Sequence, residues 1–258
     1  MIFKKIKSIY DGNPPEVIKL KLKKYFIKSH TKKYDSKINF YDIPIIINNR
    51  NRLTFLKEQL NWFEKNKHKN IIIIDNQSTY LPLINFYENL NHRVIRLNKN
   101  YGYLSLWISG LFNEFKNEFY VYTDPDIVPI DECPKDFLNY FYETLIKYNE
   151  IDKVGFGLKI DDIIINSKFI INNEKKFWTN KYKNTNFYKA SIDTTFALYK
   201  PNRFGGYWLN SLRSDYPFIA RHLPWYKNYN EIENKFYLEN IKYNSSFYDN
   251  NRGSEYEL

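Results

Sequence analysis

FYVYTDPDIVPI, residues 119–130, is the most informative segment of the chain. Its first four residues are apolar or aromatic, as is typical of a strand buried in a sheet. Asp124 and Asp126 follow, with only Pro125 between them. Two carboxylates at the end of a buried strand are costly unless a partner such as Mg²⁺ or Mn²⁺ neutralises their charge. Asp-Pro-Asp is also good turn chemistry, so the segment alone leaves a metal site and a plain turn both open.

The segments before residue 119 alternate between short apolar runs and stretches with helical spacing. We expect strands at 43–47, 70–75, 94–97 and 119–122, and helices at 53–65, 80–90 and 103–115. This strand–helix alternation predicts an α/β fold with a doubly wound, mostly parallel sheet. Beyond Pro134 the pattern is irregular. There we expect a helix at 137–148, a strand at 154–158, loops and short strands over 161–190, and a strand at 191–199. The glycines of the strand at 154–158 would let another backbone approach closely.

Polar clusters follow each of the first four predicted strands, at residues 48–52, 75–78, 98–102 and 124–126. In a doubly wound sheet, ligands bind beyond the carboxyl ends of the strands. Four clusters at that edge indicate a polar binding site there. The sequence contains no GxGxxG after the first strand and no GxxxxGK[ST], so the dinucleotide fingerprint and the P-loop are both absent.

The chain has 258 residues and a net charge of +10, which is unevenly distributed. Residues 1–41 hold eleven lysines against Asp11, Glu16 and Asp35, so this segment alone carries +8. We therefore divide the chain into a basic N-terminal extension, 1–41, and a folded domain, 42–258. The extension suits either a peripheral contact with an anionic membrane surface or a solvated helix lying on the domain. Because the basic charge is outside the fold, we expect no nucleic-acid partner.

Cys133 is the only cysteine, which excludes an internal disulfide and fits a reducing compartment. We expect no secretory signal at the N-terminus, because the first residues lack an apolar core segment. No stretch approaches the ~18 apolar residues of a membrane-spanning helix. These features predict a cytoplasmic protein whose membrane contact, if the extension provides one, is peripheral at the surface.

Four segments resemble the N-terminal half of a GT-A nucleotide-sugar glycosyltransferase of the family 2 type. They are the first strand with NNRNR at 48–52, IIIIDNQS at 71–78, NKNYGYLSLWISG at 98–110 and YTDPDIVP at 122–129. The similarity covers residues 43–130, and later segments resemble small members of the family. The resemblance implies a GT-A fold with an irregular C-terminal acceptor region. It also implies a DXD motif that uses Mn²⁺ or Mg²⁺.

The resemblance also implies residue roles. Asp75 matches the acid that hydrogen-bonds the nucleotide base, and Asn48 and Arg52 match the loop near the base and the diphosphate. Asp124 matches the acid near the ribose and the metal, and Asp126 matches the direct metal ligand. The turn that holds Asn100 and Gly102 belongs to the same edge, where we expect it to contact the nucleotide. The sequence departs from the family at Asn76, where a second acid is common, and in lacking a visible Glu-Asp pair for the catalytic base.

An inverting transferase needs a base near the acceptor hydroxyl. Asp193 is the first candidate because it opens a predicted strand, and a turn or capping aspartate is the alternative for it. Asp215 is the second candidate, and a retaining reaction stays open. Three tryptophans suit either stacking on sugar rings or core packing, namely Trp178, Trp208 and Trp225.

His222 is the candidate for a third metal ligand. The chain has four histidines, and only His222 lies in a distinctive cluster, with Pro224 and Trp225 beside it. Imidazole is an acceptable ligand for Mn²⁺. The segment also resembles one in GT-A families where a C-terminal histidine completes the metal shell. A structural histidine packed against Trp225 is the alternative.

Taken together, these features predict a metal-dependent glycosyltransferase of the hexosyltransferase kind. It would move a sugar from a nucleotide-sugar donor, a UDP-sugar first, to a hydroxyl of a glycan acceptor in glycan biosynthesis. The alternative function is a non-catalytic protein that binds a nucleotide sugar or a glycan.

Overall fold

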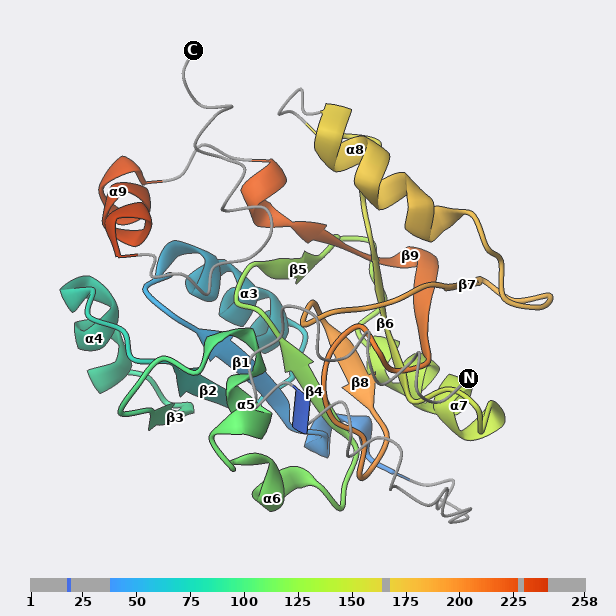
Figure 1. The fold of residues 1–258 in the computed structure, drawn as a ribbon, viewed down its shortest axis with the longest axis horizontal. Coiled ribbons are helices and arrows are strands. Elements are labelled where there is room, and N and C mark those ends of the chain that lie inside the picture. The colour runs from blue at the N-terminus through green and yellow to red at the C-terminus, as the bar shows by residue number, and fades with distance from the viewer. Residues whose placement is uncertain (1–17, 20–37, 164–167, 227–229, 241–258) are drawn as a thin grey trace.

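The computed structural model describes residues 18–19, 38–163, 168–226 and 230–240. Within these residues, the strands form one sheet in the order β3-β2-β1-β4-β8-β6-β9-β5, and β7 pairs with β9 off this path. Helices pack on the sheet, as Figure 1 shows. The predicted doubly wound α/β fold is therefore confirmed.

The first half of the sheet is parallel. It contains β1 (Ile45–Asn49), β2 (Ile71–Asp75), β3 (Arg93–Arg96) and β4 (Tyr120–Thr123). Strands β1 and β2 are buried along their whole length, so continuous isoleucine runs suit them. The connections contain α3 (Thr54–Lys65) and α4 (Leu81–Glu88). In register, Asn49 pairs with Asp75 and Ile47 with Thr123, so the polar residues after these strands meet at one edge.

The second half of the sheet is mixed. It contains β5 (Ile127–Pro129), β6 (Lys153–Leu158), β7 (Phe187–Lys189), β8 (Ala197–Tyr199) and β9 (Ser211–His222). Strand β8 runs antiparallel to both β4 and β6, whereas β6 and β9 are parallel. Strand β5 pairs antiparallel with the end of β9. This last pairing connects the Asp-Pro-Asp turn to the C-terminal part of the chain.

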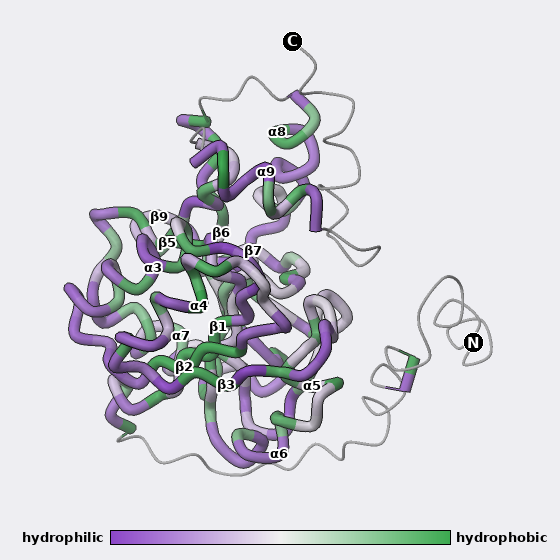
Figure 2. The backbone as a smooth tube through the Cα atoms, turned by 90° about the vertical axis from the view of Figure 1, so that its left-hand side faces the viewer, coloured by the Kyte–Doolittle hydropathy of each residue, from purple (hydrophilic) through white to green (hydrophobic). Residues whose placement is uncertain are grey.

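Two hydrophobic cores cover the two faces of the sheet. Ile45 and Ile47 point into the core that contains α3, α4 and α7 (Phe137–Lys147), whereas Ile46 points into the opposite core with α5 (Ser105–Ile108) and α6 (Phe112–Phe115). This alternation follows from the two-residue period of a strand. Figure 2 shows β1 and β2 as hydrophobic segments in the middle of the molecule.

The prediction that another backbone approaches the glycines of β6 is confirmed. A Cβ on Gly155 would lie 2.1 Å from the carbonyl oxygen of Phe196, and one on Gly157 would lie 2.4 Å from that of Ser214. Real Cβ atoms do not come this close to backbone, so only glycine fits at either position without a shift of the sheet.

The predicted helix at 103–115 is wrong as a single element. The chain forms a 3₁₀ turn at Gly102–Leu104 and then α5 and α6, which are separated at Gly110. Gly110 has a φ of +90°, which no right-handed helix accommodates. The predicted strand at 191–199 is confirmed only over β8, and residues before it form a loop.

Several elements were missed at the sequence level. Helix α8 (Lys168–Lys175) and a 3₁₀ turn at Lys176–Trp178 lie where we expected loops and short strands, and β9 and α9 (Glu231–Glu239) were not predicted. Among the described residues, no helix is both long and apolar enough to cross a bilayer. The predicted basic extension, 1–41, lies outside the described residues except for positions 18–19 and 38–41.

Candidate functional site

Asp126 and His222 lie side by side at the junction of β5 and β9. The antiparallel pairing places Ile127 opposite His222, and the backbone N–H of Leu223 donates to the carbonyl oxygen of Asp126 at 2.9 Å. This arrangement puts His222 Nε2 at 3.3 Å from Asp126 Oδ2. The side chains of His222 and Asp126 are 17% and 18% exposed, so both are mostly enclosed but still reach solvent. Residues that are 96 positions apart in the chain thus form one pair.

The Asp126–His222 pair fits a divalent cation. Two ligands in neighbouring octahedral positions, each about 2.1 Å from a cation, lie about 3 Å apart. The observed separation of 3.3 Å is close to that value. The other ring nitrogen of His222, Nδ1, is buried and finds no hydrogen-bond partner among the described residues, so Nε2 is the nitrogen that faces the carboxylate. Carboxylate oxygen and imidazole nitrogen are both accepted by Mn²⁺.

Asp124 lies on the same turn and is held from two sides. The hydroxyl of Thr194 donates to Asp124 Oδ2 at 3.0 Å. The side-chain amide of Gln59 donates to the carbonyl oxygen of Asp124 at 2.9 Å. In the described part of the chain, no group of three or more His, Cys, Asp and Glu side chains is placed to hold a metal. Any cation here would therefore need further ligands from a bound molecule, as Mg²⁺ does when substrate phosphates complete its shell.

The clusters after β1, β2 and β3 meet at the carbonyl oxygen of Gly102. Asn76 Nδ2 donates to this oxygen at 2.9 Å and Asn48 Nδ2 at 3.4 Å. The N–H of Gly102 in turn donates to Asn100 Oδ1 at 2.8 Å, and Asn48 Oδ1 accepts from the Ser105 hydroxyl at 2.7 Å. The predicted convergence of the strand-end clusters is thus seen in the structure, and Asn76 takes part in it as an amide.

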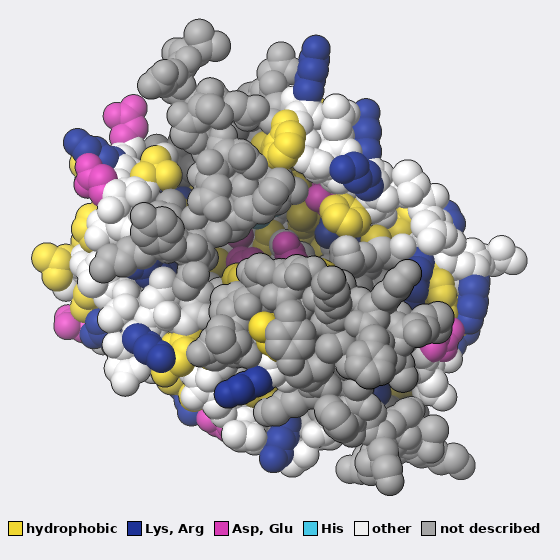
Figure 3. All heavy atoms as spheres, viewed as in Figure 1, with side chains coloured by type: hydrophobic (Ala, Val, Ile, Leu, Met, Phe, Trp, Pro, Cys, Tyr) yellow, Lys and Arg dark blue, Asp and Glu magenta, His cyan; other side chains and the backbone are white. Residues whose placement is uncertain are grey.

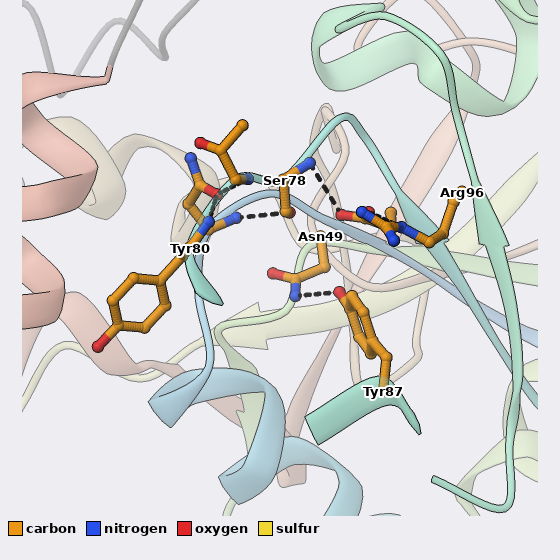
Figure 4. A network of polar contacts seen from close by, with 8 residues as sticks. Asn49, Ser78, Tyr80, Tyr87 and Arg96 are labelled. Carbon is orange, nitrogen blue, oxygen red and sulfur yellow. Dashed lines mark hydrogen bonds and ion pairs between the residues drawn. The ribbon is translucent and has the colours of Figure 1, made fainter. Parts of the chain in front are cut away.

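Asp75 is more deeply enclosed than the sequence suggested. Its side chain is 1% exposed, and its two oxygens accept from the backbone N–H of Ser78 at 3.1 Å and from Arg96 Nε at 3.2 Å. Figure 4 shows its two partners, Ser78 on the β2–α4 loop and Arg96. The expected contact between Asp75 and a nucleotide base stays a prediction. In this structure, the exposed partner at that position is the side chain of Arg96, which is 54% exposed.

The loops after β1 and β2 are joined by asparagine side chains. Asn51 Oδ1 accepts from the backbone N–H groups of Thr79 and Tyr80, at 2.8 and 3.1 Å, and Asn51 N donates to the Ser78 hydroxyl at 2.9 Å. Beneath them, Asn49 Nδ2 donates to the Tyr87 hydroxyl at 2.8 Å (Figure 4). These contacts fix the two loops relative to each other.

Arg52 does not face the site in this structure, contrary to the expectation that it lies near the base and diphosphate. It is 7% exposed, its guanidinium lies 3.4 Å from the ring centre of Tyr237, and its NH1 donates to Asn234 Oδ1 at 3.2 Å. Both partners belong to α9. The side chains of α9, a helix that was not foreseen, satisfy this arginine here, and its role near the base and diphosphate stays a prediction.

Asp193 lies next to the site, on the loop before β8. Its neighbour Thr194 contacts Asp124, and its own Oδ1 accepts from the backbone N–H of Thr195 at 3.0 Å. The second bond is the turn contact that we considered as the alternative for this residue. The Asp193 side chain is exposed, and the buried Lys153 fixes its backbone by donating from Nζ to the Asp193 carbonyl oxygen at 3.0 Å.

Asp215 is not brought to the site. It lies in β9, seven positions before His222. Lys181 Nζ lies 2.7 Å from the Asp215 carboxylate, and the Tyr188 hydroxyl donates to the same carboxylate at 3.3 Å. Partial burial acts to raise the pKa of Asp215, but Lys181 and the local hydrogen bonds hold it below its ordinary value. A carboxylate held in this ion pair is a poor general base, so the structure does not support Asp215 in that role.

One of the three tryptophans is fully buried, and the other two pack against glycines. Trp225 is 1% exposed and belongs to the core, so the sugar-stacking alternative is wrong for it. Trp208 lies against Gly205, where an added Cβ would meet the indole at 2.0 Å, and Trp178 packs in the same way against Gly157. Both are partly buried.

Sequence reasoning missed the buried side chains that support the Asp-Pro-Asp turn and the loop before β8. Gln59, Thr194 and the ion pair between Glu174 and Arg213 are buried, and nothing in their local sequence distinguishes them. Burial raises the pKa of Glu174, although the adjacent Arg213 opposes this effect. Arg213 Nε also donates to the carbonyl oxygen of Ser191 at 2.9 Å, which fixes the start of the loop that carries Thr194. Figure 3 views the molecule from the same side as Figure 1 and shows a hollow near the centre, with acidic side chains, coloured magenta, at its floor.

Comparison with known proteins gives only distant likenesses. No protein-family model matches the chain, and no curated protein matches its sequence. TarS from S. aureus, residues 1–349, aligns at 17% identity and a TM-score of 0.38, over 62% of this chain and 47% of that fragment. A cytidylyltransferase from Leptospira borgpetersenii aligns at 9% identity and a TM-score of 0.35, over 62% of this chain and 60% of that one.

A mycobacterial protein aligns at 11% identity and a TM-score of 0.41, over 79% of this chain and 75% of its own. TarS structures with UDP-GlcNAc and with UDP are among the matches, at TM-scores of 0.39. The chain spans about half the length of these TarS structures, covering 45% and 46% of them.

Proposed function

We propose that the protein is a divalent-cation-dependent glycosyltransferase that moves a sugar from a nucleoside-diphosphate sugar, a UDP-sugar first, to a hydroxyl of a glycan acceptor. The observation that supports this most is the Asp126–His222 pair, 3.3 Å apart beside Asp124 at the carboxyl edge of the sheet. Two protein ligands, one from the turn before β5 and one from the end of β9, leave most of a cation's coordination positions open. A nucleotide diphosphate supplies the oxygens that such an incomplete site needs.

The residues have distinct roles in this proposal. When bound, Mn²⁺ or Mg²⁺ would neutralise the charge that develops on the departing nucleoside diphosphate. Asp126 and His222 would hold the cation, and Asp124, oriented by Thr194, would face the ribose and the cation. The hydrogen bonds of Asn48, Asn76 and Asn100 to the backbone of Gly102 would shape the nucleotide side of the site.

Asp193 is the proposed general base. It is exposed, it adjoins Thr194 at the site, and Lys153 fixes its backbone. A base must come within hydrogen-bond reach of the acceptor hydroxyl and accept its proton as the new glycosidic bond forms. The side chains of Tyr103 and Tyr207 lie near Asp193 and are 42% and 48% exposed, so they offer aromatic faces on the acceptor side.

Sugar transfer and donor hydrolysis by the purified protein test the function. UDP-GlcNAc, which one of the TarS structures contains, is a convenient first donor in a panel of UDP-, GDP- and dTDP-sugars. We expect turnover that requires Mn²⁺ or Mg²⁺, stops with excess EDTA and is lost in Asp126→Asn while the melting temperature is kept. Asp193→Asn should reduce transfer while nucleotide binding stays unchanged. Full activity of Asp126→Asn, or full activity in EDTA, would contradict the proposal. Binding of a nucleotide sugar without any turnover would favour the non-catalytic alternative.

A further inference from the structure

Gln59 is a buried amide on α3 that reaches the turn carrying both aspartates. Its Nε2 donates to the carbonyl oxygen of Asp124 at 2.9 Å and to that of Ile127 at 2.7 Å. These two carbonyls lie at the two ends of the Asp-Pro-Asp turn. One side chain, 0% exposed, therefore bridges the two ends of the turn.

The orientation of this amide is fixed by its surroundings. Both neighbours are carbonyl oxygens, which only accept, so the NH₂ group and not the oxygen must face them. The amide oxygen of Gln59 is left buried, with no hydrogen-bond partner among the described residues. A buried polar atom without a partner costs about 1–3 kcal/mol. An apolar side chain on this helix face would avoid that cost, so the two donated bonds must compensate for it.

The turn is also held by other hydrogen bonds, besides those of Gln59 and the Thr194 contact with Asp124. The Thr123 hydroxyl donates to the Asp124 carbonyl oxygen at 2.9 Å, and the Leu223 N–H donates to that of Asp126 at 2.9 Å. The second bond ties the turn to the strand of His222, while Gln59 ties it to α3. Gln59 and Leu223 thus anchor the turn that carries Asp126 to two different elements, α3 and the end of β9.

We propose that Gln59 is a positioning residue that sets the cation-binding geometry of Asp126 and His222 by clamping the ends of the Asp-Pro-Asp turn. It does not itself touch the cation or the substrate. This inference rests on the proposed function, because it assumes a cation at the pair. Loss of the clamp removes the bonds that Gln59 donates to the two carbonyls and lets the turn relax away from the 3.3 Å separation.

The test compares Mn²⁺ affinity of the full chain, measured by electron paramagnetic resonance of free Mn²⁺ without any turnover. Gln59→Met keeps the length of the side chain and removes both donors. Lys200→Met is the matched control, because Lys200 is buried and donates from Nζ to two backbone carbonyls, of Tyr148 at 3.0 Å and Asn149 at 3.3 Å. Lys200 follows β8 at the end where Tyr199 pairs with Tyr120, away from the aspartates.

We expect Gln59→Met to bind Mn²⁺ at least tenfold more weakly than the wild type, and Lys200→Met to bind it as the wild type does, although both lose stability. Gln59→Glu, which keeps one donor when it is neutral, should lie between them and serves if Gln59→Met does not fold. Equal Mn²⁺ affinity in the wild type and the Gln59 variants would overturn the inference and leave the proposed function intact. A wild type that binds no Mn²⁺, with or without UDP, would overturn both.

Discussion

Thr194 reaches the Asp124 carboxylate directly with its hydroxyl, and it has a natural control beside it. Its Oγ1 donates to Asp124 Oδ2 at 3.0 Å, whereas the buried hydroxyl of Thr195 has no hydrogen-bond partner among the described residues. Thr194→Val should weaken the binding of UDP with Mn²⁺ by roughly fivefold, the equivalent of about 1 kcal/mol. Isothermal titration should find Thr195→Val unchanged. Equal loss in both variants would mean that the hydroxyl contact has no role in binding.

The buried Lys153 should make the stability of the protein depend on pH. Burial lowers the pKa of Lys153 to about 7 from its ordinary value of 10.5. The charge of Arg213 lowers this pKa further, whereas Asp193 and Asp152 raise it. The Tyr199 hydroxyl accepts a hydrogen bond from Lys153 Nζ at 3.0 Å. Between these two pKa values, the unfolded chain holds a proton that the folded chain has lost. Stability therefore rises with pH across this window, by up to about 1.4 kcal/mol per pH unit from this group.

Urea unfolding from pH 6 to pH 10 checks this expectation. The wild type should gain stability relative to Lys153→Met as the pH rises above about 7. Lys57→Met, at an exposed position on α3, should follow the wild type at every pH. Parallel curves for the wild type and Lys153→Met would show that Lys153 keeps its proton in the folded protein.

At the scale of elements, α9 completes the N-terminus of α3. The residue before this helix is Leu53, whose side chain makes no capping bond. Glu233 of α9 replaces it: its carboxylate accepts from the N–H groups of Leu53 and Thr54, at 3.1 and 3.0 Å, and from the Thr54 hydroxyl at 2.7 Å. A carboxylate at this position also interacts favourably with the helix dipole. The helix that carries Gln59 is thus fixed by a segment 180 residues away.

Glu233→Ala should lower the free energy of unfolding by about 1–2 kcal/mol, because partly buried donors at the start of α3 lose their acceptor. Glu231→Ala, in the exposed first turn of the same helix, should change it by a few tenths of a kcal/mol. Denaturant titration of the two variants measures the difference. Equal stabilities would show that α9 contributes no cap to α3.

At the scale of the whole molecule, the sequence predicts the parallel half of the sheet well, because its strands are continuous apolar runs that end in polar clusters. It fails where partners are distant in the chain. Helix α9 could not be foreseen as the element that satisfies Arg52, and the 12-residue β9 is only in part apolar. Within the site, the pairing of Asp126 with His222 followed from residue chemistry and a resemblance, whereas Gln59 and Thr194 required the structure.

The central claim is that Asp126 and His222 hold one divalent cation together with a nucleotide diphosphate. Pulsed electron paramagnetic resonance of Mn²⁺ bound to the full chain with UDP tests it directly, because nitrogen and phosphorus nuclei coordinated to Mn²⁺ modulate the signal. We predict nitrogen and phosphorus couplings in the wild type, loss of only the nitrogen coupling in His222→Ala, and loss of tight Mn²⁺ binding in Asp126→Asn. A phosphorus coupling without any nitrogen coupling in the wild type would contradict the role of His222, and the absence of bound Mn²⁺ would contradict the site as a whole.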